Sequence, residues 1–307
     1  MHIDDDHPFR ELSSRSGSLP IVLSSPHSGT EFPLEAGVAL AVTNNDLKAL
    51  DDGPTDALVA ATRDLGAGVL CARYSRAYVD LNRSPYEIDP AHLDHEALPR
   101  LANVTPKVQV GLGVIPSRVA GRLIYRAPLS LSNIDARLRL GYYPYHDRLW
   151  RIAQERRSAS GSVVLLDCHS MPPEAASIAG QRAPLDIAVG DRFGASAHPV
   201  LVQTIVKLVE RSGLRVAQNR PYAGGFITEH YGRPHSGMHA VQLEIRRDLF
   251  YDRRTRALST RASLFTRLLC DLVIELSRVL PGVPRSIERA DAPMLANLPR
   301  PSMLAAD

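Results

Sequence analysis

The stretch that decides the fold is Ser162-Val-Val-Leu-Leu-Asp-Cys-His-Ser170. It begins as an apolar, β-branched run and ends in a group of polar side chains. It lacks the apolar–polar alternation of a strand that has one face in water. Such a run is typical of a strand covered on both faces, as in the parallel sheets of α/β proteins. The polar residues that follow would then lie at the carboxyl end of the strand, where ligands of α/β sheets bind.

Runs of the same kind recur along the chain and alternate with helical patterns. The other strand-like runs are Leu19–Ser25, Gly68–Tyr74, Asp186–Val189, Arg215–Ala217 and Ala240–Ile245. Apolar residues at helical spacing predict helices over Asn45–Leu65, Asn133–Ser158 (with a break expected at Pro144), Pro199–Ser212 and Arg256–Leu280. Strands that alternate with helices predict βαβ units, so the expected fold class is α/β.

Length and composition restrict the class of protein. The chain has 307 residues, of which 44% are hydrophobic and 22% charged, and these values exclude a mostly disordered chain or a coiled coil. We expect one domain over residues 1–280, with an irregular excursion at about 85–126 and a Pro-rich tail over 281–307. The net charge is only +3, without a block of Lys or Arg, so no nucleic-acid partner is expected.

Cysteine usage and the N-terminus indicate a compartment. Cys71, Cys168 and Cys270 are few and widely spaced, which argues against a disulfide framework and fits a reducing environment. The first residues are acidic and polar, unlike a signal peptide. No stretch reaches the roughly 18 apolar residues of a membrane span. We therefore expect a cytoplasmic protein without a membrane partner, and the sequence leaves its oligomeric state open.

Two histidines stand at the ends of strand-like runs. His27 comes shortly after Ser25, and His169 comes shortly after Asp167. Both are therefore expected at the same edge of the sheet. Two histidines and a carboxylate are the protein ligands of many catalytic zinc sites, which keep a further position for water. The carboxylates available for such a site are Asp51, Asp52 and Glu31. The alternative is that each histidine only caps its strand through a hydrogen bond.

An arginine-rich segment follows the strand-like run that ends at position 74. It contains Arg76, Asn82 and Arg83. A guanidinium group binds a carboxylate through two parallel hydrogen bonds, and an amide adds a directed donor. This segment is therefore a candidate site for an anionic substrate. The alternative is a structural pairing of an arginine with Asp80 or Asp52.

A carboxylate and a glycine-containing loop lie near the last strand-like run. Glu244 lies within Ala240–Ile245, where an ionised side chain is costly unless it is partnered. Beside a catalytic metal it would serve as a general base, and the alternative is an ion pair with a buried arginine. The loop Gly224-Gly-Phe-Ile-Thr-Glu-His-Tyr-Gly232 allows close approach of backbone to a ligand. Thr228 in this loop and His239, which precedes Glu244, are candidates for substrate contact. The alternative is that the loop is an ordinary hairpin-like turn.

Four motifs together resemble the N-formylglutamate amidohydrolase family, in the order in which that family has them. They are Pro26-His-Ser-Gly-Thr-Glu-Phe-Pro33, Tyr74-Ser-Arg-Ala-Tyr-Val-Asp-Leu-Asn-Arg83, Leu166-Asp-Cys-His-Ser170, and Gly224-Gly-Phe-Ile-Thr228 through His239-Ala-Val-Gln-Leu-Glu244. The resemblance spans roughly residues 18–275. The family is similar in fold to zinc carboxypeptidases and aspartoacylase-like deacylases. The resemblance implies a mixed, mostly parallel central sheet with helices on both faces.

The resemblance also implies an activity and a metal. It implies a hydrolase with one zinc ion per chain that cleaves the formyl amide of N-formyl-L-glutamate, giving formate and L-glutamate, a late step of histidine degradation. By motif, His27 and His169 would be zinc ligands. Asp52 is the third ligand expected from the family, and Glu31 is the second candidate for that position.

The remaining roles follow from the same resemblance. Asn82 and Arg83 would bind a substrate carboxylate, Arg76 would polarise the scissile carbonyl, and Glu244 would be the general base.

A related zinc amidohydrolase acting on another N-acyl amino acid or a short peptide is the first alternative function. A non-catalytic binding protein for small carboxylates is an alternative of another class. A nucleotide enzyme is disfavoured, because the chain has no phosphate-binding glycine loop.

Overall fold

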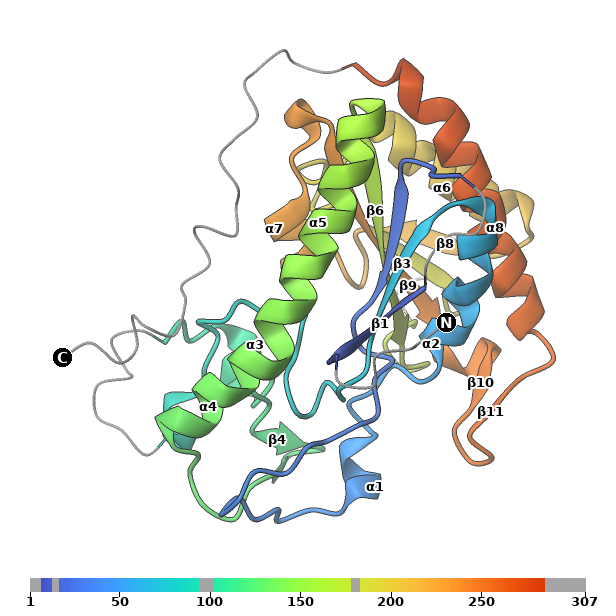
Figure 1. Cartoon of the computed structure of the whole chain (residues 1–307). Coiled ribbons are helices and arrows are strands. Elements are labelled where there is room, and N and C mark those ends of the chain that lie inside the picture. The colour runs from blue at the N-terminus through green and yellow to red at the C-terminus, as the bar shows by residue number, and fades with distance from the viewer. Residues whose placement is uncertain (1–6, 13–16, 94–101, 178–182, 285–307) are drawn as a thin grey trace.

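A mixed β-sheet forms the centre of the computed structural model, which describes residues 7–12, 17–93, 102–177 and 183–284 (Figure 1). Its seven strands have the order β1-β3-β2-β6-β9-β7-β8. Their bounds are β1 Phe9–Leu12, β2 Ile21–Ser25, β3 Gly68–Ala72, β6 Val163–Met171, β7 Ile187–Gly190, β8 Val216–Gln218 and β9 Met238–Arg246. The pairs β1–β3 and β7–β9 are antiparallel, and the other neighbours are parallel. The expected α/β class with a mixed, mostly parallel sheet is confirmed.

Helices cover both faces of this sheet (Figure 1). They are α1 Asn44–Leu47, α2 Thr55–Val59, α3 Pro106–Gln109, α4 Leu131–Arg137, α5 Tyr143–Ser160, α6 Pro199–Arg211, α7 Phe226–Tyr231 and α8 Ala262–Val279. Alternate residues of a strand enter different cores. Ile21 and Leu23 belong to the core that includes residues of α2, α6 and α8, whereas Val22 belongs to the core that includes residues of α4, α5 and α7. Burial of both faces explains why these strands read as continuous apolar runs.

The helix expected over Asn45–Leu65 is wrong as a single element. The chain forms α1, leaves the helix at residues 48–54, and then forms α2 and a 3-10 helix, Ala60–Leu65. Gly53 has φ of +74°, a conformation that favours glycine, and Pro54 follows it at the start of α2. The break carries Asp52 to the end of β2, where its backbone N–H donates to the carbonyl of His27 at 3.1 Å.

Three other expectations differ in detail. Pro144 does not break the chain's helical path, because it lies in the first turn of α5, where no backbone N–H is needed. A π-helical segment, Leu138–Tyr142, joins α4 to α5. Helix α8 begins at Ala262, later than expected, after a hairpin of β10 (Tyr251–Asp252) and β11 (Ala257–Leu258). Strand β1 was not among the expected strands.

The excursion over 85–126 contains little regular structure in its described part. It holds a 3-10 turn (Pro90–His92), α3, and a hairpin of β4 (Arg118–Val119) and β5 (Arg122–Leu123). The domain boundaries 1–280 and 281–307 stay a prediction, since 285–307 lie outside the described residues. Within the described residues, no helix has the length and apolar character needed to cross a membrane.

Candidate active site

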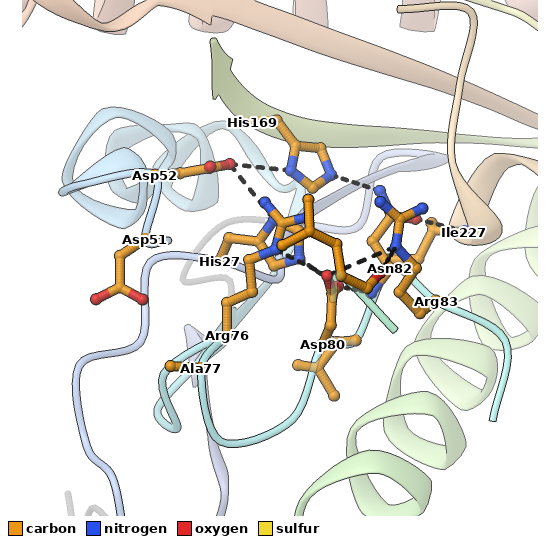
Figure 2. Close-up of polar contacts among 12 residues, drawn as sticks. His27, Asp51, Asp52, Arg76, Ala77, Asp80, Asn82, Arg83, His169 and Ile227 are labelled. Carbon is orange, nitrogen blue, oxygen red and sulfur yellow. Dashed lines mark hydrogen bonds and ion pairs between the residues drawn. The ribbon is translucent and has the colours of Figure 1, made fainter. Parts of the chain in front are cut away.

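The carboxyl ends of β2 and β6 bring the two histidines together. Ser24 pairs with Asp167 in the parallel register of these strands, and the ring centroids of His27 and His169 lie 4.6 Å apart. Asp52 joins them from the break between α1 and α2. One ligand atom from each of the three buried side chains lies within 4.8 Å of the others (Figure 2). The structure thus converges two imidazoles and one carboxylate on a single point.

Each histidine has a second carboxylate on its outer nitrogen. His27 Nε2 lies 2.7 Å from Asp80, and His169 Nε2 lies 2.8 Å from Asp167. A carboxylate in this position fixes a metal-binding imidazole in the tautomer whose other nitrogen is free to coordinate. His27 Nδ1 is buried and has no hydrogen-bond partner, which is costly unless a ligand occupies the site. The donor set of two imidazole nitrogens and one carboxylate oxygen fits zinc.

The electrostatics of this cluster favour a cation. Burial alone would raise the pKa of Asp52, but the hydrogen bond from His169 and the nearby ring of His27, whose Nδ1 lies 3.6 Å away, hold that pKa well below its ordinary value. Burial alone would lower the pKa of His169, but Asp167 and Asp52 raise it well above its ordinary value. The buried carboxylates therefore stabilise positive charge at this point, and a metal ion that binds there displaces protons.

The other carboxylates considered for the metal lie elsewhere. Glu31, with a side chain 54% exposed, is bound to Arg73 at 2.9 Å. Asp51 points away from the histidines and accepts a hydrogen bond from the Ser75 hydroxyl at 2.8 Å (Figure 2). Of the three carboxylates, the structure brings only Asp52 to the two histidines.

A cavity of about 500 Å³ opens over these ligands. Most of the residues proposed to bind substrate or act in catalysis line it. The polar and glycine residues of its wall include His27, Asp52, Arg76, Asn82, Arg83, Lys107, His169, Ser170, Gly224, Gly225, Gln242, Glu244, Arg247 and Arg253. The cavity is rich in cationic side chains.

Glu244 enters the cavity from β9, directly beside His169 in the parallel register of β6 and β9. The carboxyl group accepts a hydrogen bond from Gln242 Nε2 at 2.7 Å and makes no ion pair within the described residues. Burial raises the pKa of Glu244 to about 7. A carboxyl group with such a pKa is suited to accept and return a proton near neutral pH.

Asp80 connects His27 to the arginines. One of its oxygens lies 2.7 Å from His27 Nε2, and the other lies 2.7 Å from Arg76 Nε and 3.8 Å from Arg83 Nε (Figure 2). Arg83 Nε also donates to the carbonyl of Leu112 at 3.0 Å. The terminal Nη groups of both arginines have no hydrogen-bond partner in the described part of the chain. They are therefore available to an anion in the cavity.

Asn82 is held between His169 and the glycine loop. Its amide oxygen accepts from the backbone N–H of Ile227 at 2.8 Å, and its amide nitrogen lies 3.1 Å from His169 Nε2. A Cβ on Gly225 would sit 2.4 Å from the Asn82 amide nitrogen, so only glycine fits there. The glycine loop was expected to bring its backbone close to a ligand, and in the structure it brings Gly225 close to the Asn82 side chain.

Thr228 and His239 do not line the cavity. Thr228 is buried and donates its hydroxyl to the carbonyl of Gly225 at 2.8 Å, so it supports the glycine loop from behind. His239 pairs with Val164 at the amino-terminal end of the parallel strands, and burial lowers its pKa to about 4. The alternation of side chains along a strand shows which face of the sheet a residue is on. It does not show how far along the strand the ligand binds, so it could not exclude His239.

Sequence reasoning also missed residues that line the cavity. Arg247 donates to Ser170 and lies 3.5 Å from Asp52, and its position directly after β9 was an available signal. Arg253 reaches the cavity from the β10–β11 hairpin, and Lys107 reaches it from α3. No sequence pattern in the excursion marks Lys107.

Comparisons with known proteins identify relatives over most of the chain. The family model described as N-formylglutamate amidohydrolase matches residues 19–251. A protein named N-formylglutamate deformylase from Pseudomonas putida is 30% identical over 245 residues, covering 78% of this chain and 85% of the relative. One of the same name from Pseudomonas aeruginosa is 30% identical over 250 residues, with the same coverage. The crystal structure of N-formylglutamate amidohydrolase from Ralstonia eutropha JMP134 is 32% identical, covers 89% of this chain and 98% of its own, and superposes with a TM-score of 0.83.

Proposed function

The chain belongs to the N-formylglutamate amidohydrolase family, and we propose that it is a zinc-dependent hydrolase that converts N-formyl-L-glutamate and water to formate and L-glutamate. One observation carries this proposal. His27, Asp52 and His169 converge within 4.8 Å in a cavity that also holds the buried carboxyl of Glu244 and the free guanidinium ends of two arginines. The proposal includes a place in histidine degradation. We also propose a cytoplasmic location, which the three free cysteines support.

The metal would be held by Nδ1 of His27, Nδ1 of His169 and the carboxylate of Asp52. When bound, zinc supplies Lewis acidity, which lowers the pKa of a water and polarises a carbonyl. Asp80 and Asp167 accept the Nε2 protons of the histidines and hold both rings in orientation.

The protein side chains orient the substrate and move its protons. The Nη groups of Arg83 and the amide of Asn82 bind one carboxylate of the glutamyl group, which fixes the formyl carbon near Glu244. Arg76 donates to the oxygen of the scissile carbonyl, where negative charge develops. Glu244 takes a proton from the attacking water and returns it to the leaving amine.

Metal content and formate release test the proposal together. Protein purified without chelator is expected to carry about one zinc per chain by elemental analysis. It should release formate from N-formyl-L-glutamate, and chelation should remove both the zinc and the activity. Bound zinc without formate release would show that N-formyl-L-glutamate is not the substrate. A folded protein that takes up no zinc and shows no turnover would favour a carboxylate-binding protein instead.

A pair of variants tests the third ligand in the same assay. D52N should lose stoichiometric zinc, because it replaces a carboxylate ligand by a neutral amide. E31Q should retain zinc, because Glu31 lies on Arg73 outside the cluster. Retention of zinc by D52N together with its loss in E31Q would assign the ligand to Glu31.

Lys107 gives a prediction about the side-chain carboxylate of the substrate. The backbone N–H of Leu112 donates to the carbonyl of Lys107 at 2.8 Å, and Arg83 donates to the carbonyl of Leu112. Lys107 and Arg83 are thus fixed on one wall, where Lys107 has no acidic partner among the described residues. A second carboxylate on the substrate would supply that partner.

The expected result is selective. K107M should lower kcat/KM for N-formyl-L-glutamate by about tenfold, the size of one charge-assisted hydrogen bond at a partly exposed site. It should leave kcat/KM for N-formyl-L-glutamine nearly unchanged, because the amide carries no charge. K207M, at an exposed position of α6, is the matched control. An equal loss on both substrates would show that Lys107 does not read the carboxylate.

A further inference from the structure

A second cavity of about 520 Å³ adjoins the active-site cavity. It shares Ala49, Arg247 and Arg253 with the first cavity. Its remaining wall comes from β1, the segment after β2, α1 and the residue after it, the loop of Asp51 to Pro54, α2, and the β10–β11 hairpin. The proposed deformylation uses no residue that lies only in this second cavity.

The second cavity has more positive than negative side chains in its wall. Its basic residues are Arg10, Lys48, Arg247, Arg253 and Arg256, and its acidic residues are Asp51 and Asp56. Arg10 and Asp56 form an ion pair with each other, which removes one charge of each sign. Lys48 and Arg253 make no ion pair within the described residues. The wall therefore has an excess of positive charge that attracts an anionic group.

The hydrogen-bonding groups of the wall also favour an anion. Asn45 already accepts a hydrogen bond from Arg256, and the Asp51 carboxyl is engaged by Ser75. The Thr30 hydroxyl and the Lys48 ammonium remain as donors without a side-chain partner in the described part of the chain. Hydrogen-bond donors beside cationic side chains are the groups that bind a carboxylate.

The second cavity lies away from the wall proposed to bind the glutamyl group. Lys107 and Arg83 form that wall on the side of α3, whereas the second cavity lies on the side of the β10–β11 hairpin. Figure 1 shows α3 and this hairpin on opposite sides of the sheet. If the glutamyl carboxylates bind on the α3 side, the acyl side of the scissile amide is directed toward Ala49, Arg247 and Arg253, which line both cavities. A formyl group ends in a hydrogen atom there and fills none of the second cavity.

We infer that the second cavity binds the acyl part of larger substrates, N-acyl-glutamates whose acyl group carries its own carboxylate, such as N-succinyl- or N-glutaryl-L-glutamate. This inference rests on the proposed function, because it uses the same reaction centre. Water adds to the amide carbon, the C–N bond breaks, the amine takes up a proton, and the products are a dicarboxylate and glutamate. Lys48 and Arg253 bind the distal carboxylate of the acyl group.

A substrate series in which acyl groups of matched length differ in charge tests the inference. The zinc-loaded enzyme is assayed with N-formyl-, N-butyryl-, N-succinyl- and N-glutaryl-L-glutamate, where butyryl matches succinyl without its carboxylate. We expect succinyl or glutaryl to exceed butyryl in kcat/KM by about tenfold or more, since the carboxylate gains charge-assisted hydrogen bonds. A butyryl substrate cleaved as well as both dicarboxylic ones would overturn the role of charge.

Lys48 is the residue to change, because it lines only the second cavity. K48M should reduce kcat/KM for the preferred dicarboxylic substrate by about tenfold and leave N-formyl-L-glutamate within twofold of wild type. K207M is again the control. If K48M has no effect, the second cavity does not bind the acyl carboxylate.

The two proposals fail in different ways. If N-formyl-L-glutamate is cleaved but the dicarboxylic substrates are neither cleaved nor competitive inhibitors, only the acyl site is refuted. If formylglutamate is not cleaved, the proposed function fails. Calorimetric binding of N-glutaryl-L-glutamate to wild type and K48M then decides the acyl site on its own, because a site for the acyl carboxylate requires weaker binding to K48M.

Discussion

E244Q is expected to lower kcat for formate release by about a thousandfold, within the roughly 10²–10⁴ range of general acid–base catalysis. Glutamine has the shape of glutamate but cannot take up a proton from water. Its side-chain oxygen can still accept the hydrogen bond from Gln242, so the strand and the cavity should be preserved. The substrate carboxylate binds to other residues, so KM should change little.

Three measurements make this result specific to proton transfer. Zinc content should stay at the wild-type level, because Glu244 is not among the three clustered ligands. The thermal midpoint should not fall, since the substitution replaces a buried acid by a neutral amide of equal size. E229Q is the matched control, because Glu229 is exposed and pairs with Arg192. Retention of more than a tenth of wild-type kcat by E244Q would show that another group is the base.

The sequence predicted the position of the two histidines for a physical reason. Strands buried on both faces read as apolar runs, and the residues directly after parallel strands meet at one edge of the sheet. His27 follows β2 as this rule requires, whereas His169 lies inside β6, which continues to Met171. The rule therefore gave the correct edge of the sheet for both histidines, but the strand end expected at Asp167 was wrong. The choice among Asp51, Asp52 and Glu31 did need more, because it depends on where the helix expected over Asn45–Leu65 breaks. Family resemblance, and not periodicity, indicated Asp52.

Residues from irregular segments were not predictable in this way. Lys107 and Arg253 reach the cavity from α3 and from a hairpin, and neither follows an apolar run. Asp80 was weighed only as a structural partner of an arginine. Its buried carboxylate contacts both His27 and the arginines, an arrangement that depends on side-chain geometry in three dimensions.

D80N and D167N should differ sharply, although each removes the carboxylate behind one histidine. Loss of such a partner typically lowers metal affinity by about 10–100-fold, and we expect this loss in both variants. At saturating zinc, D167N should recover to within about tenfold of wild-type kcat/KM. The amide that D167N introduces can accept from His169 and donate to the Ser24 hydroxyl, which lies 3.0 Å from the Asp167 carboxylate.

D80N should stay lower by about a thousandfold in kcat/KM at saturating zinc, roughly 4 kcal/mol. The Asp80 carboxylate accepts hydrogen bonds from His27, from Arg76 and from the backbone of Asn82. An amide has one acceptor oxygen, so its NH₂ group would face one of these donors and leave it unsatisfied. Arg76 would also lose its anionic partner, and the position of its guanidinium would no longer be fixed.

Chelator competition, kcat and KM at saturating zinc, and the thermal midpoint separate the two roles of Asp80. A role only in metal binding predicts equal kcat/KM for D80N and D167N once zinc is saturating. A role in holding the arginines predicts that D80N alone keeps a raised KM and a reduced kcat. If D80N unfolds below the assay temperature, R76M removes only the arginine from this network. It should then reduce kcat/KM while zinc affinity stays near wild type, and wild-type kcat/KM in R76M would refute the link between Asp80 and the substrate.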